Sequence, residues 1–98
     1  MKFTLDYSDT AKEQLREIKN TLHLEKRYKA VTKALKYLAD NPKHPGLQTH
    51  PYTSFEGPRG EKVFEAYAEQ DTPAAYRIFF YYGNTRGLLV VLAITPHP

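Results

Sequence analysis

The spacing of apolar residues restricts the fold of this chain more than any other feature. After a short alternating segment at residues 2–7, the first half repeats apolar side chains at helical intervals, whereas the second half follows strand patterns. We therefore predict an α+β fold in which a two-helix hairpin covers one face of an antiparallel sheet of about four strands. The expected elements are helices near 9–21 and 25–40 and strands near 2–7, 62–69, 75–82 and 88–95.

Polar and proline-containing segments mark the ends of these elements. Thr10 and Glu13 have the spacing of a capping box at the start of the first helix. Pro42 ends the second helix, because proline disfavours helix in the residue before it. The segment 41–60 holds four prolines and three glycines and is expected to be a long loop. Loops of this length in small domains are often functional.

Size and composition fit one globular domain, residues 1–98. Hydrophobic residues make up 41% of the chain, charged residues 26%, and there is no cysteine. No apolar run approaches the ~20 residues that span a bilayer, and the first residues are too polar for a signal peptide. We expect a cytoplasmic protein without a membrane partner. The first half of the chain has a net charge of +4 and the second half one of −1, and the basic excess either solubilises the helices or attracts nucleic acid or an acidic partner.

The pairing of two central strands can be predicted from their apolar residues. Burying the two apolar sets on one face pairs Phe64 with Phe80, because a one-residue slip would separate them. Tyr67 then lies opposite Arg77, and Glu65 lies on the same second face.

The same reasoning, applied to the last strand, pairs Tyr82 with Leu88. The second face would then carry an apolar set that two helices cannot cover, namely Phe79, Tyr81, Leu89 and Val91. We expect another chain or the 41–60 loop to cover this set, and a homodimer through this face is one alternative.

A candidate site follows on this second face. It joins Glu65, Tyr67, Arg77 and His97, with small neighbours that leave room above them. An arginine in an aromatic strand can hold a phosphate, and a histidine can act as a general acid or base. The alternative is structural, an ion pair between Arg77 and Glu65 or Glu69. His44, His50 and Glu56 could ligate a metal, but their spacing matches no zinc pattern, and we expect no metal or cofactor.

The chain also resembles the RelE/ParE superfamily of toxins from type II toxin–antitoxin systems. The order of elements is similar, and three segments carry the likeness: Phe55-Glu56-Gly57, the strand Tyr76-Arg77-Ile78-Phe79-Phe80-Tyr81, and the final strand with Thr95-Pro96-His97. The acidic residues Glu61, Glu65 and Glu69 depart from the basic surroundings usual in RelE-like nucleases.

This resemblance implies a toxin that is neutralised by a cognate antitoxin. RelE-like members cleave mRNA on the ribosome, which would make the chain an endoribonuclease, whereas ParE-like members inhibit DNA gyrase without catalysis. The resemblance implies catalytic roles for Arg77 and His97, and the predicted strand pairing adds Glu65 as a base or an orienting residue. The candidate substrate-binding residues are Tyr67, Arg59, Lys62 and Tyr81. A non-catalytic binding toxin and a small dimerising domain are the alternatives.

Overall fold

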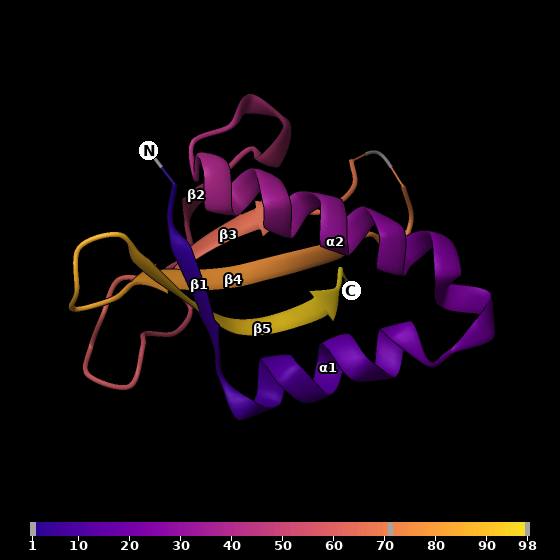
Figure 1. Cartoon of the computed structure of the whole chain (residues 1–98), viewed down its shortest axis with the longest axis horizontal. Coiled ribbons are helices and arrows are strands. Elements are labelled where there is room, and N and C mark those ends of the chain that lie inside the picture. The colour runs from indigo at the N-terminus through magenta and orange to yellow at the C-terminus, as the bar shows by residue number, and fades with distance from the viewer. Residues whose placement is uncertain (1, 71, 98) are drawn as a thin grey trace.

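A helix layer lies on one face of a five-stranded sheet in the computed structural model, which describes residues 2–70 and 72–97 (Figure 1). The strands are β1 (Thr4–Tyr7), β2 (His50–Pro51), β3 (Phe64–Tyr67), β4 (Tyr76–Tyr82) and β5 (Leu88–Pro96). The helices are α1 (Asp9–Lys19) and α2 (Glu25–Asp40), with 3₁₀ turns η1 (Leu22–Leu24) and η2 (Pro45–Leu47). The predicted α+β class and both helices are confirmed. None of the helices described here has the length and apolarity to cross a membrane.

The sheet is mixed, in the order β1-β5-β4-β3-β2. The pairs formed by β2 to β5 are antiparallel, as expected, but β1 runs parallel to β5. No hairpin turn sets the direction of β1, because the helices and the other strands separate it from β5 in sequence. The extra strand is β2, and its two residues are too few to give a periodic pattern.

The predicted pairing of β3 with β4 is confirmed along its whole length. Phe64 pairs with Phe80, and Tyr67 pairs with Arg77. The rings of Phe64 and Phe80 stack with centroids 5.8 Å apart and belong to the core beneath the helices. Cross-strand aromatic pairs of this kind stabilise a sheet beyond the area that they bury.

The predicted pairing of β5 is wrong. Tyr82 pairs with Leu89, not Leu88, and the register shifts again between Phe79 and Phe80. Leu89 and Val91 therefore face the helices and are fully buried in the core, instead of lying on the second face. The apolar run of β5 supplies hydrophobic residues to both faces, so its pattern could not distinguish the two registers.

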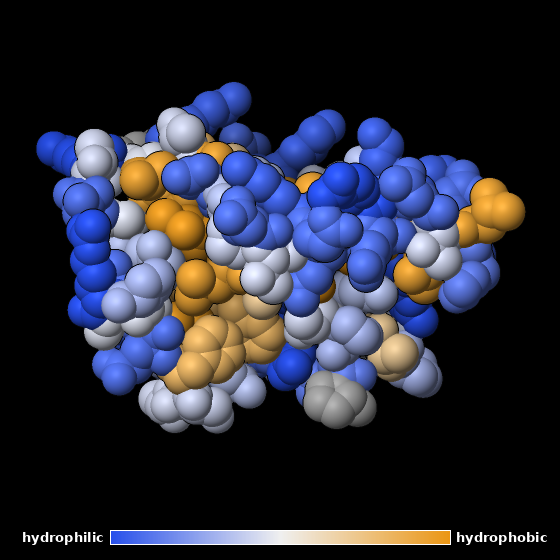
Figure 2. Space-filling model, turned by 90° about the horizontal axis from the view of Figure 1, so that it is seen from below, coloured by the Kyte–Doolittle hydropathy of each residue, from blue (hydrophilic) through white to orange (hydrophobic). Residues whose placement is uncertain are grey.

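The 41–60 loop covers the second face where Phe79 lies. The Phe79 side chain is almost fully buried, and its ring centroid lies 4.8 Å from that of Tyr52 and 5.4 Å from that of Phe55. The expectation of a covering loop is thus confirmed for Phe79. Figure 2 shows a largely hydrophilic surface over α1, with apolar side chains gathered towards the β1 end.

Ser8 links the start of α1 to β5, and the capping box predicted at Thr10 and Glu13 is wrong. The Ser8 hydroxyl oxygen accepts a hydrogen bond from the Ala11 amide at 3.0 Å, which caps the helix. The same hydroxyl donates to the Leu92 carbonyl at 2.7 Å. The helix begins at Asp9, two residues earlier than a Thr10 cap would allow, and its cap is the side chain that also bonds to β5.

We expect Ser8→Ala to lower the free energy of unfolding by about 1–2 kcal/mol, because it removes the helix cap and the bond to β5 together. Thr10→Ala is the matched control and should change that free energy by less than about 0.5 kcal/mol. Urea denaturation followed by circular dichroism measures both. Equal effects for the two variants would contradict the capping role of Ser8.

Candidate functional site

A buried carboxylate, that of Glu65 on β3, is the centre of the candidate site. Its residue is 3% exposed, and it is the buried charged residue of the described chain. The Arg77 guanidinium on β4 donates to Glu65 Oε2 at 2.7 Å, and His50 Nε2 lies 2.7 Å from Glu65 Oε1. A buried charge requires such partners, because removing it from water is costly. The structural alternative for Arg77, a pair with Glu65, is therefore present.

His50 on β2 is the site residue that the sequence reasoning missed. Its Nδ1 lies 2.8 Å from the Gln48 carbonyl oxygen, so both ring nitrogens face hydrogen-bond acceptors. The only sequence signal was a histidine before a proline, and the two-residue strand that delivers it cannot be recognised by pattern. Among the described residues, no group of three His, Cys, Asp or Glu side chains could hold a metal ion.

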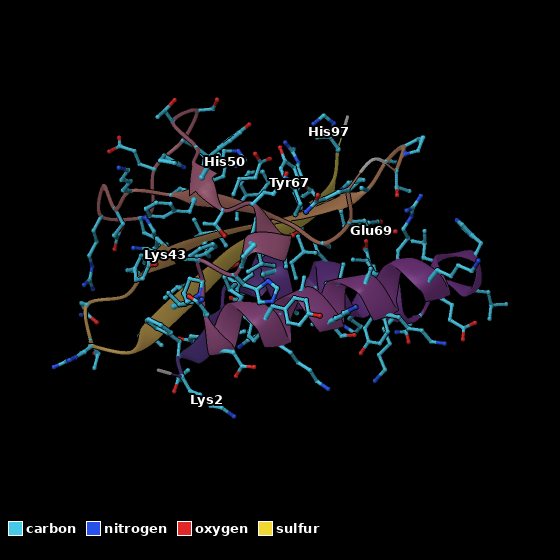
Figure 3. All side chains as sticks on the ribbon, turned by 90° about the horizontal axis from the view of Figure 1, so that it is seen from above. Lys2, Lys43, His50, Tyr67, Glu69 and His97 are labelled. Atoms are coloured by element: carbon cyan, nitrogen blue, oxygen red, sulfur yellow. The ribbon has the colours of Figure 1, made fainter. Side chains whose placement is uncertain are left out.

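Tyr67 on β3 joins this network to the surface. Burial, followed by the charge of Glu65 and a hydrogen bond to that carboxylate, raises the pKa of Tyr67 above its usual value. Its ring centroid lies 5.6 Å from that of His50. Figure 3 shows both side chains on the side of the sheet opposite to the helices.

Arg77 is not freely presented to solvent. Its side chain is 13% exposed, and its guanidinium carbon lies 4.8 Å from the centre of the Phe79 ring. Arg77 Nε is buried and has no hydrogen-bond partner among the residues that the structure describes. Buried donors without a partner are uncommon in native proteins. One arm of the guanidinium is thus neutralised by Glu65, while another donor is left unused.

An open groove of about 850 Å³ lies next to this network, and Tyr67 and His97 both line it. The main chain of His97 is fixed there, because its amide donates to the Ala75 carbonyl at 2.8 Å. Arg27 of α2 holds the other wall, with bonds of 2.8 Å to Glu69 and 2.9 Å to the Pro73 carbonyl. Arg27 thus holds the segment after β3 that lines the groove together with Gln48, Tyr67 and His97.

The remaining predicted substrate-binding residues lie away from this groove. Lys62 places its ammonium 5.6 Å from the centre of the Phe64 ring, which belongs to the helix-packed core. Arg59 and Tyr81 line a different, smaller depression beside the β4–β5 turn. Of the seven predicted residues, the structure brings together Glu65, Tyr67 and Arg77 as one network, with His97 across the adjoining groove.

Comparison with known proteins gives a likeness in structure without a likeness in sequence. No protein-family model and no curated protein matches the chain. Solved structures do match over almost their full length. A chain of the archaeal RelE–RelB complex from Pyrococcus horikoshii has a TM-score of 0.65 at 12% identity, with 98% of this chain and 96% of that chain covered.

Two further structures give the same result. A YoeB/ParE toxin from Agrobacterium tumefaciens has a TM-score of 0.68 at 12% identity, and the match covers 100% of both chains. The DinJ–YafQ toxin–antitoxin complex of E. coli has a TM-score of 0.66 at 16% identity, with 99% of this chain and 94% of that chain covered. The chain therefore has the fold of the RelE/ParE superfamily of toxins.

Proposed function

We propose that this protein is the toxin of a toxin–antitoxin pair and that it cleaves single-stranded RNA at the groove between Tyr67 and His97. The observation that carries this proposal is the groove itself, which adjoins the Glu65, Arg77 and His50 network. The fold shared with toxins supports the assignment. A histidine and a tyrosine facing one groove are suited to move the two protons that phosphodiester cleavage requires.

The reaction that these groups support is attack by a ribose 2′-hydroxyl on its own 3′-phosphate. Tyr67 takes the 2′ proton and passes its own to Glu65, to which it is hydrogen-bonded. The bond from phosphorus to the 5′ oxygen breaks, and His97 protonates that oxygen. Arg77, whose guanidinium lies beside Glu65, offsets the negative charge that develops on the phosphate. His50 orients Glu65.

A second candidate, a toxin that binds its target without catalysis, is favoured by one observation. Arg77 is already paired with Glu65 and is largely buried, so the carboxylate of Glu65 already neutralises part of its charge. A ligand that contacts Arg77 would need either to displace Glu65 or to bind the guanidinium alongside it. Substitutions at Arg77 and His97 distinguish the two candidate functions.

An antitoxin segment is the proposed protein partner. RelE–RelB and DinJ–YafQ were solved as complexes, which supports a similar partner for this chain. The net charge of +3 suits a partner that is acidic. Phe55 is 40% exposed above Phe79 and offers an apolar contact for such a segment.

We expect Arg77→Ala to reduce RNA cleavage by about 10²–10³-fold and to relieve growth inhibition on expression, because it removes charge stabilisation at the phosphate. Arg77→Lys should restore little, since an ammonium cannot both hold Glu65 and contact a phosphate. Cleavage of a purified mRNA, with and without ribosomes, measures the rate.

Circular dichroism on the same samples distinguishes lost chemistry from lost folding, because Arg77→Ala leaves Glu65 buried without its strongest partner. A folded Arg77→Ala variant with full toxicity would remove Arg77 from catalysis and leave non-catalytic binding as the function.

We also expect His97→Ala to slow cleavage by about 10²-fold or more, without lowering the thermal stability, because its side chain is exposed. His23→Ala is the matched control, since His23 is also exposed but lies on η1, at the tip of the helix hairpin. Wild-type rates in both variants would show that His97 is not the general acid.

A further inference from the structure

Backbone strain is concentrated at the groove. Two non-glycine residues of the described chain have a positive φ, Gln48 at 47° and Ala74 at 58°, and both line this groove. Side chains other than glycine rarely adopt this conformation, and such strain persists where the surrounding structure requires it. Strained residues cluster at ligand sites more often than elsewhere. Of these two, only Gln48 carries a side chain with hydrogen-bonding groups.

Gln48 is held by its main chain and has an unused side chain. Its carbonyl oxygen receives the hydrogen bond from His50 Nδ1 at 2.8 Å, so the left-handed turn connects Gln48 to the Glu65 network. The side-chain amide of Gln48 is exposed and has no hydrogen-bond partner among the described residues.

The other two glutamines of the chain differ in this respect. Gln14 Oε1 accepts from the Ile94 amide at 2.7 Å, and Gln70 Nε2 donates to the Gly46 carbonyl at 2.8 Å. The side chains of Gln14 and Gln70 therefore each have a hydrogen-bond partner within the protein. The amide of Gln48 is the one that remains available to a ligand in the groove.

We infer that Gln48 contacts a nucleobase of single-stranded RNA through that base's Watson–Crick edge, an inference that rests on RNA being the target. An amide presents one donor and one acceptor side by side, and each of the four bases offers a complementary pair on this edge. Tyr67, on the same groove, supplies an aromatic face on which an unstacked base can pack. The groove volume of about 850 Å³ is ample for one nucleotide.

The chemistry of this contact allows a substitution that discriminates between guanine and adenine. Gln48→Glu replaces the donor–acceptor pair with two acceptors and keeps the length of the side chain. Only guanine places two donors, N1–H and N2–H, side by side on its Watson–Crick edge. A carboxylate at this position therefore forms two hydrogen bonds with guanine and one with adenine. Gln48→Met keeps the length and removes both polar groups.

The test measures binding without cleavage. The probes are fluorescein-labelled trinucleotides UAU and UGU with 2′-O-methyl groups, which block attack by the 2′ oxygen, and the readout is fluorescence anisotropy. The wild-type protein should bind the two within about threefold of one another. Gln48→Glu should favour UGU over UAU by about tenfold relative to the wild type, which corresponds to one good bidentate contact. Gln48→Met should weaken both without changing their ratio.

The added negative charge of Gln48→Glu weakens all RNA binding, but this effect cancels in the ratio of the two probes. Thermal melting shows whether each variant is folded, and all three proteins carry the same strain at residue 48. An unchanged ratio in a folded Gln48→Glu variant overturns the inference, as does failure of the wild type to bind either probe. A guanine switch in a protein that cleaves no RNA would confirm the contact and reject the nuclease.

Discussion

The buried carboxylate of Glu65 is the interaction on which the arrangement of the second face depends. It receives hydrogen bonds from Arg77 on β4, from His50 on β2 and from Tyr67 beside it on β3. Removing one partner of a buried ion pair typically costs about 3–5 kcal/mol, because a charge then remains without compensation. In a domain of 98 residues this is a large part of the total stability. The network therefore holds three strands in place as well as shaping the groove.

The same carboxylate limits what Arg77 can do. A guanidinium that is tied to Glu65 and packed on Phe79 cannot move far toward a ligand. Its planar geometry still allows it to keep Glu65 on one side while a second donor meets a phosphate. Glu65 thus fixes the orientation of the Arg77 guanidinium. Electrostatic stabilisation of a transition state requires charged groups whose orientation is fixed in this way. The ion pair with Glu65 is therefore compatible with the catalytic role that we propose for Arg77.

Sequence reasoning succeeded where side chains alternate clearly between a buried and an open face. Phe64, Ala66, Ile78 and Phe80 determined the pairing of β3 with β4, and this pairing brought Glu65, Tyr67 and Arg77 together. It failed for β5, because Leu88 to Ile94 is apolar at every position and every register therefore buries apolar side chains against the helices. It missed His50 and Gln48, since their positions depend on a two-residue strand and a left-handed turn within a proline-rich loop. Neither feature has a periodic signal.

The contacts that α1 makes with β5 also determine where this sheet can grow. β1 pairs with β5 only as far as Val91. Beyond that point the Ser8 hydroxyl donates a hydrogen bond to the Leu92 carbonyl, and the Ile94 amide donates one to the side chain of Gln14. Exposed strand edges invite pairing with other chains, and proteins protect themselves by covering such edges. The side chains of Ser8, which caps α1, and Gln14, within α1, provide that cover here. A foreign strand therefore meets a Leu92 carbonyl and an Ile94 amide that are already bonded, which guards the longest strand of the described sheet against edge-to-edge association at these positions.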